Sequence, residues 1–388
     1  MEKKNQVPKY PPLRFPEFTD EWTQTTIGEI CKVSTGEMNT QDKIEDGMYP
    51  FYVRSSKIER ANRYTYDGVA ILTPGDGAIG QIFHYSKGKI AVHQRVYMLT
   101  EMQCIPKYLF HCFSARFFGR VNRMSAKNTV DSVRMNMITD MPIPLPSLPE
   151  QRKIAALLSL IDERIEVQNA IIKEREAQKA ALLRRLFDRT LRFPEFTDEW
   201  KEVKLGEVAE RIKKRNTGHI TRVLTISAQY GLVEQEDFFS KRVSSVDLSN
   251  YFLVEKGEFA YNKSYSRGYP WGTIKRLDQY DSGVLSPLYI GFRLKDDGID
   301  SDYLQQYFEG SQWHKKISLI AMEGARNHGL LNITIQDFFN LPLRLPSLPE
   351  QKKIAALLSA IDERLDVERA YAEQLRQQKA YLLRQMFI

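Results

Sequence analysis

The 388-residue sequence is poor in the features that mark secreted, disulfide-bonded and membrane-spanning proteins. Its three cysteines, Cys31, Cys104 and Cys112, form no CxxC pair, so we expect reduced, buried thiols. No apolar run approaches the roughly 18 residues that a membrane helix needs. The first residues carry charge without the apolar segment of a signal peptide behind them. These absences predict a cytoplasmic protein.

Motifs that would indicate an enzyme are also missing. There is no P-loop, no HExxH and no [DNS]PP[YFW] element of an amino-methyltransferase. Gly75-Asp76-Gly77 with Gly80 resembles half of a phosphate-binding loop, but it lies between two strand patterns and no helix pattern follows, so we interpret it as a hairpin turn. The six histidines are scattered, and His111 lies among apolar residues of a helical pattern. We therefore expect no catalytic site, no metal site and no cofactor bound by this chain.

The composition suits a globular protein with a slight excess of positive charge. Hydrophobic residues make up 42% and aromatic residues 11%, which is enough to fill ordinary cores. The 56 basic residues exceed the 49 acidic ones, for a net charge of +7. This excess is compatible with a polyanionic partner but does not require one.

An internal repeat determines the predicted domain organisation. The motif LRFPEFTDEW occurs identically at 13–22 and 191–200, and we call it the opening motif. Residues 145–168 match residues 345–368 at 19 of 24 positions, beginning with LPSLPEQ in both copies. The blocks between these repeated parts, about 23–144 and 201–344, share little sequence. Two repeated frames thus hold two different inserts.

Each LPSLPEQ motif begins a long predicted helix. Glu150 and Glu350 place negative charge in the first turn, where the helix dipole favours it. The apolar residues that follow have a mean spacing of 3.5, as in a left-handed coiled coil: Ile154, Leu158, Ile161, Ile165, Ile172, Leu182 and Leu186 in the first helix, and Ile354, Leu358, Ile361, Leu365, Leu375, Leu382 and Met386 in the second. Polar residues interrupt both seams at Gln168, Arg175, Lys179, Glu368 and Lys379.

The order of these parts predicts the fold class and the domain boundaries. If the seams pair, the second helix runs back along the first, so the pair is antiparallel and the molecule has pseudo-two-fold symmetry. We predict an α+β protein in which two mixed α/β domains are separated by a pair of long antiparallel coiled-coil helices. The four parts are a first domain at 1–144, a first helix at 145–190, a second domain at 191–344 and a second helix at 345–388.

Both variable blocks show short strand patterns followed by a helix. In the first block we predict strands at 49–58, 68–74, 78–86 and 91–100 and a helix at 105–122. In the second block we predict strands at 252–264, 272–277 and 286–294 and a helix near 302–319. We interpret the charged residues Asp162, Glu163 and Arg164, with their copies in the second helix, as solvated charges or a surface for partner docking.

Some of the predicted turns combine basic, amide, hydroxyl and aromatic side chains, the mixture that contacts DNA phosphates and base edges. Any one such cluster is also typical of an ordinary solvated loop. Lys127 and Arg326, however, lie at equivalent positions, 18 and 19 residues before the two LPSLPEQ motifs. The candidate DNA-binding residues are Arg54, Ser55, Ser56, Lys57, Gln94, Arg95, Lys127 and Asn128 in the first block, and Lys263, Tyr265, Arg267, Arg326, Asn327 and His328 in the second.

The repeated frame resembles the specificity subunit of type I restriction–modification systems. The resemblance rests on the opening motif, the variable block ending in LPSLPEQ and the helix beginning KIAALLSLIDERI, each present twice and in the family's order. It implies a non-catalytic DNA-binding subunit whose two target-recognition domains each read one half of an asymmetric, bipartite site, while the helices set the gap between the halves.

The resemblance also implies partners, while the residues alone leave alternatives open. Two methyltransferase subunits would bring S-adenosylmethionine, and restriction subunits that translocate on double-stranded DNA would bring ATP and Mg²⁺. The alternatives are a coiled-coil adaptor that binds only proteins and, with less support, a methyltransferase or nuclease in its own right.

Overall fold

The computed structural model describes residues 10–124, 132–218, 220–228, 230–239, 247–265, 268–322 and 331–387. The chain forms two compact units. Unit 1 comprises Met1–Ala170 and Ala370–Ile388, and unit 2 comprises Ile171–Arg369. Each unit therefore contains one variable block together with a part of each long helix.

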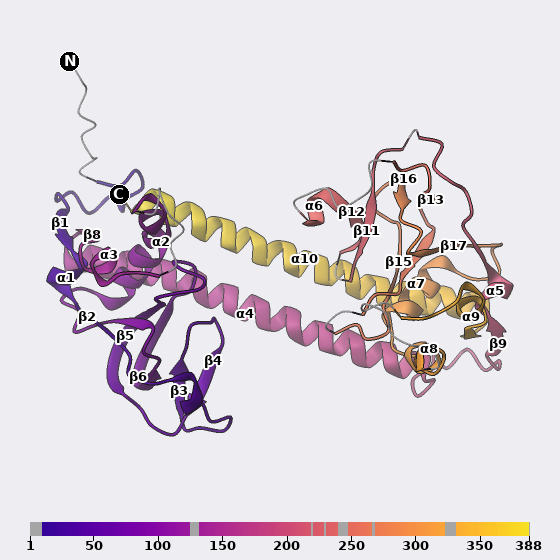
Figure 1. The fold of residues 1–388 in the computed structure, drawn as a ribbon, viewed down its shortest axis with the longest axis horizontal. Coiled ribbons are helices and arrows are strands. Elements are labelled where there is room, and N and C mark those ends of the chain that lie inside the picture. Colours follow the sequence, from indigo (N-terminus) through magenta and orange to yellow (C-terminus); the bar gives the residue numbers. More distant parts are fainter. Residues whose placement is uncertain are drawn as a thin grey trace, which may run out of the picture. The chain divides into compact units, whose positions relative to one another are not determined.

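Unit 1 consists of a curved sheet, several short helices, one helix of 19 residues and the adjoining parts of the long helices (Figure 1). Its strands in the order β2-β7-β5-β6-β3-β4 form one six-stranded sheet, and β1 pairs with β8 separately. The elements are β1 (Thr23–Thr26), α1 (Ile27–Ile30), β2 (Lys32–Thr35), the 3₁₀ helix η1 (Thr40–Asp42), β3 (Tyr49–Tyr52), β4 (Ile58–Ala61), β5 (Tyr66–Pro74), β6 (His84–Val92), β7 (Val96–Thr100), α2 (Pro106–Met124), α3 (Met135–Thr139), β8 (Pro142–Leu145) and the first part of α4 (Leu148–Phe187).

Unit 2 has a corresponding series of elements. Its largest sheet has the order β10-β17-β14-β15, and further pairs join β11 to β12, β13 to β16 and β18 to β9. The elements are β9 (Lys201–Lys204), α5 (Leu205–Val208), β10 (Ala209–Arg211), β11 (Leu224–Ser227), β12 (Gly231–Glu234), α6 (Gln235–Phe239), β13 (Phe252–Glu255), β14 (Phe259–Asn262), β15 (Thr273–Arg276), β16 (Ser282–Leu285), β17 (Ile290–Leu294), α7 (Ser301–Glu309), α8 (His314–Met322), α9 (Ile335–Phe339), β18 (Pro342–Leu345) and the first part of α10 (Leu348–Met386).

Each domain core extends onto the long helices. In unit 1, Ile71 of β5 and Phe113 of α2 are fully buried in one cluster with Leu158 of α4 and Met386 of α10. In unit 2 the matching cluster includes Phe292 of β17 and Leu358 of α10. The helices are therefore integral to both cores and do not merely link the domains.

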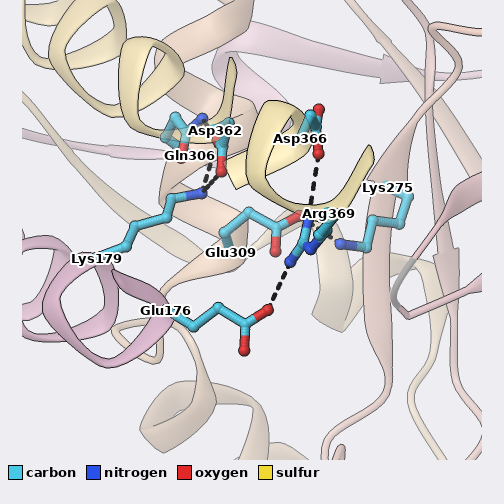
Figure 2. Close-up of polar contacts among 8 residues, drawn as sticks. All are labelled: Glu176, Lys179, Lys275, Gln306, Glu309, Asp362, Asp366 and Arg369. Atoms are coloured by element: carbon cyan, nitrogen blue, oxygen red, sulfur yellow. Dashed lines mark hydrogen bonds and ion pairs between the residues drawn. The ribbon is translucent and has the colours of Figure 1, made fainter. Parts of the chain in front are cut away.

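Within each unit, the two helical segments run antiparallel and are joined by polar side chains. In unit 1, Asp162 of α4 forms an ion pair with Lys379 of α10. In unit 2, Lys179 Nζ lies 2.7 Å from Asp362 Oδ2, and Arg369 donates to Glu176 at 2.7 Å (Figure 2). The predicted antiparallel pairing is confirmed. The interpretation of Asp162 as a solvated or docking charge is wrong, because its carboxylate is used between the helices.

A buried ion pair recurs in both copies of the frame. The guanidinium of Arg14, in the first opening motif, donates to both carboxylate oxygens of Glu150 at 2.7 and 2.8 Å. Arg192 and Glu350 repeat this contact at 2.8 and 2.9 Å. The glutamates predicted at the first turn of each long helix are thus fully buried, and each of them holds one opening motif against the start of its helix.

Each opening motif forms a backbone hydrogen bond with the last turns of a long helix. The backbone N–H of Leu191 donates to the carbonyl of Arg185, near the end of α4, at 3.0 Å. In unit 1 the N–H of Leu13 donates to Gln385, near the end of α10, also at 3.0 Å. The two opening motifs therefore occupy equivalent places, each against the C-terminal end of a long helix.

Several predicted elements are confirmed, and others have the wrong bounds. The helix at 105–122 corresponds to α2, and the cysteines are free and buried. The strand predicted at 78–86 begins only at His84, because Gly77 and Gly80 turn the chain with positive φ angles of 77° and 66°.

Four further predicted elements are each divided in two. The strand predicted at 49–58 consists of β3, a connection at 53–57 and the first residue of β4. Residues 93–95 are a turn between β6 and β7, and the strand predicted at 252–264 is interrupted between β13 and β14, where Gly257 has a φ of 88°. The helix predicted near 302–319 is interrupted between Glu309, the last residue of α7, and His314, the first residue of α8.

Candidate nucleic-acid interface

The two variable domains share one sheet topology. In unit 1, neighbouring strands of the sheet are β2, β7, β5 and β6, and in unit 2 they are β10, β17, β14 and β15, all antiparallel to their neighbours. In both units, the strand that comes last along the chain lies between the first and the second. The loop from β5 to β6 thus corresponds to the loop from β14 to β15. Val133 donates to Gly75 at 2.6 Å in the first loop, and Leu331 donates to Lys263 at 2.9 Å in the second. Four strands are therefore common to both domains, and the two domains differ in the strands added to them and in their loops.

In unit 1, the structure brings two of the predicted clusters together. Arg54, Ser55, Ser56 and Lys57 lie in the connection from β3 to β4, and Gln94 and Arg95 lie in the turn from β6 to β7. All six are exposed. The two turns are adjacent because β3 runs parallel to the end of β6, where the backbone N–H of His93 donates to the carbonyl of Tyr52 at 3.0 Å.

The carboxylate of Asp76 joins these two turns, and the sequence reasoning missed it. Arg95 Nη1 lies 2.8 Å and Arg54 Nη1 3.2 Å from Asp76 Oδ2. The Asp76 side chain is 14% exposed, whereas those of Arg54 and Arg95 are 47% and 64% exposed. The signal was present in the Gly-Asp-Gly turn, which we interpreted as a hairpin connection only. That connection is confirmed, because β5 and β6 pair antiparallel.

Two glycines give this turn its shape. A Cβ atom on Gly75 would lie 3.1 Å from the Arg95 carbonyl oxygen and 3.1 Å from the Tyr97 ring. Gly77 has a φ of 77°, a conformation that L-residues with side chains disfavour. Asp76 is therefore held between two positions where glycine is favoured.

Asp76 remains ionised in this setting. Partial burial raises the pKa of its carboxyl, but the hydrogen bonds from Arg95 and Arg54 outweigh burial, so the pKa lies below its ordinary value. The pKa of His93 is lowered by burial and by the nearby Arg54. A neutral His93 fits its contacts, since Nδ1 accepts from the backbone N–H of Arg95 at 3.0 Å.

The unit 2 candidates have different environments. Tyr265 is 54% exposed on the β14–β15 loop. Lys263 is half-buried, its Nζ donates to the carbonyl of Ile333 at 3.3 Å, and burial lowers its pKa. Lys263 thus supports the loop as well as contributing charge. The remaining candidates lie outside the described residues: Lys127, Asn128, Arg267, Arg326, Asn327 and His328.

Unit 2 has a cluster of basic residues that we did not predict from the sequence. The guanidinium groups of Arg211 and Arg215 lie 5.4 and 4.3 Å from the ring centroid of Phe252. Arg211 also lines a cavity of about 590 Å³, together with the basic residues Lys213, Lys214 and Lys295 and the acidic residues Glu210, Glu255 and Glu258. The signal was the basic run RIKKR at 211–215. Cations stacked on an aromatic ring beside a hollow suit contact with a polyanion.

The described ranges contain no group of three or more His, Cys, Asp or Glu side chains arranged to hold a metal ion. None of their helices has the combination of length and apolar composition needed to cross a bilayer.

Comparison with known proteins identifies the class. The family model described as the type I restriction modification DNA specificity domain matches residues 19–177 and again residues 197–377. Because the two matches together cover most of the sequence, the chain belongs to this family of DNA specificity proteins. The two mixed α/β domains in tandem, each combined with long helices, are the fold that this membership predicts.

Particular relatives agree with this assignment. The chain is 28% identical to the type I restriction enzyme EcoDI specificity subunit of Escherichia coli over 47% of this chain and 40% of that subunit. It is 23% identical to the MjaVIII specificity subunit of Methanocaldococcus jannaschii over 96% of this chain and 92% of that protein. The crystal structure of the S subunit from M. genitalium shares the fold with a TM-score of 0.62, at 17% identity and over 98% and 99% of the two chains.

Proposed function

We propose that this chain is the DNA-reading subunit of a type I restriction–modification complex, and that each variable domain reads one half of a bipartite, asymmetric site on double-stranded DNA. The long helices would set the number of unread base pairs between the halves. A net charge of +7 and a pI near 9.0 are compatible with a DNA partner.

One observation carries this proposal: a duplicated scaffold holds two different sets of loop side chains. The sheet order and the buried arginine–glutamate pair recur in both units. On the equivalent loops, Asp76 binds two arginines in unit 1, whereas unit 2 presents Tyr265. A common scaffold with different contact surfaces is suited to two half-sites of different sequence.

We propose that the chain itself catalyses no reaction and recruits the subunits that do. Two methyltransferase subunits would carry S-adenosylmethionine, and restriction subunits would carry ATP and Mg²⁺. Duplicate surfaces support two copies of one partner. Val167 on α4 and its repeat equivalent Val367 on α10 are 60% and 59% exposed, so the two helices offer matching apolar positions to a partner.

The test exchanges one variable block at a time. Residues 23–144 are replaced by the corresponding block of a relative with a different specificity, and the complex with its methyltransferase partner is used to methylate genomic DNA. Sequencing of the modified sites should show one half of the motif changed and the other half unchanged. Exchange of 201–344 is the matched control and should alter the opposite half.

Two results would contradict the proposal. If either exchange changes both halves together, the domains do not read DNA independently. If the complex does not shift duplex DNA in a gel at any sequence, the chain is an adaptor that binds proteins only.

A further inference from the structure

We infer that Arg54 and Arg95 form a guanine-reading pair in the first half-site, and that Asp76 is the residue that positions both. This inference rests on the proposed function, because it assigns a base to one of the two reading surfaces. It concerns a carboxylate in the Gly-Asp-Gly turn, which we interpreted from the sequence as a hairpin connection only.

The three residues meet because backbone hydrogen bonds join three turns. His93 N–H donates to the carbonyl of Tyr52, which places the turn after β6 beside the end of β3. Gly75 N–H donates to the carbonyl of Arg95 at 2.8 Å, which places the turn after β5 beside the same residue. Since these bonds involve the main chain, they hold the three turns together without help from the charged side chains.

The hydrogen bonds within the cluster leave donors free on both arginines. Each guanidinium uses Nη1 to reach Asp76, at 3.2 Å from Arg54 and 2.8 Å from Arg95. Among the described residues, neither side chain makes another hydrogen bond or ion pair. The Nε and Nη2 groups therefore remain available, and a guanidinium with two donors on one edge matches the O6 and N7 acceptors of guanine in the major groove.

The carboxylate favours a base over a phosphate as the contact. An anion between two arginines reduces their positive potential and repels a phosphate group. It repels the uncharged acceptor edge of a base much less. It also restricts two long side chains before DNA binds, so less conformational entropy is lost on binding. A cluster built only to hold the DNA backbone would gain nothing from Asp76.

The surroundings agree with this assignment. Arg54, Ser55, Asp76 and Gly77 line a cavity of about 550 Å³ that opens on the surface of unit 1. The imidazole Nδ1 of the neighbouring His93 accepts a hydrogen bond from the backbone N–H of Arg95, and the neutral ring adds no positive charge to the cluster. The free Nε and Nη2 donors of Arg95 would thus be presented to DNA from a fixed backbone.

The test uses the complex of the full chain with its methyltransferase partner and a duplex library with randomised positions. Selected duplexes are sequenced for the wild type, Arg54→Ala, Arg95→Ala and Asp76→Asn. The wild type should select a split motif that has guanine in the half read by residues 23–144. Each arginine variant should lower the preference for guanine there by about ten- to a hundredfold and leave the other half unchanged. Lys32→Ala removes an exposed cation of the same unit and is the charge-matched control.

Asp76→Asn distinguishes a positioning role from a structural one. It should lower the guanine preference by about tenfold, while affinity for unrelated duplex stays equal or rises because a negative charge is removed. The thermal midpoint of the chain should not change. A loss of affinity for all sequences, or a lower midpoint, would overturn the positioning role.

The remaining outcomes separate this inference from the proposed function. If the wild type selects no split motif, the proposed function fails. If it selects a split motif that lacks guanine in this half, or if both arginine variants keep the guanine, the proposed function stands and the guanine assignment is wrong. If only Asp76→Asn keeps full preference, the arginines read the base without its help.

Discussion

Removal of Arg14 should strongly destabilise unit 1. Glu150 is 1% exposed, and Arg14 donates to both of its carboxylate oxygens. Taking away one partner of a buried pair leaves an uncompensated charge, which typically costs 3–5 kcal/mol. The N-terminus of α4 offsets up to about 1 kcal/mol of this through its dipole. We therefore expect Arg14→Ala to lower the free energy of unfolding of unit 1 by about 2–5 kcal/mol.

The assay must report on each unit separately, since the chain has two. Hydrogen exchange followed by mass spectrometry, at increasing urea concentrations, gives the opening free energy of peptides from α2 in unit 1 and from α7 in unit 2. Arg14→Ala should accelerate exchange in unit 1, and the matched variant Arg192→Ala should do the same in unit 2.

A double replacement tests the cause. Arg14→Met with Glu150→Met removes both charges and keeps apolar volume, so it should cost clearly less than Arg14→Ala alone. The reasoning is refuted if Arg14→Ala costs less than about 1 kcal/mol, or if the double variant is as unstable as the single one.

Three further variants test other parts of the structure. Burial lowers the pKa of His111 to about 4, below its ordinary 6.5. Because the unfolded chain then binds the proton at a higher pH than the folded chain, the free energy of unfolding should fall by up to about 3 kcal/mol as the pH drops from about 6.5 to 4. His111→Gln should flatten this dependence in urea titrations at each pH. Lys179→Asp should destabilise unit 2, and adding Asp362→Lys should restore part of the loss in the same titration, whereas purely additive effects would refute a direct pair. Gly272→Ala should cost at least about 1 kcal/mol, because φ is 79° and the new Cβ would lie 2.2 Å from the Asn262 carbonyl oxygen; an unchanged thermal midpoint would contradict this.

The frame of this protein was predictable because its signals are local. The helix predicted within 145–190 is α4 at Leu148–Phe187, since the proline and glutamate at its start and the 3.5-residue seam act over short distances. The seam was less uniform than expected. Ile165 and Ile172 are only partly buried, whereas Leu183 and Phe187, absent from the predicted seam, are buried. The domain at the end of the helix, rather than the heptad alone, decides which residues are covered.

Strand bounds were less predictable, because they depend on how the sheet curves. Residues 84–90 of β6 pair with β5, but the last two residues of β6 pair with β3. The turn that follows was predicted as part of a continuous strand at 91–100, because its local pattern resembles one. No local pattern shows that the strand leaves one neighbour for another.

The duplicated plan, the two long helices, the family and the composition of the loops that carry Arg54 and Arg95 could be predicted from the sequence, because repeats, helix periodicity and turn residues are properties of neighbouring positions. The contacts of Asp76 with these arginines and the burial of Glu150 against Arg14 became visible only in the folded chain. Those pairs are separated by many residues along the chain, and they meet because backbone hydrogen bonds between strands and the packing of the helix start bring them together.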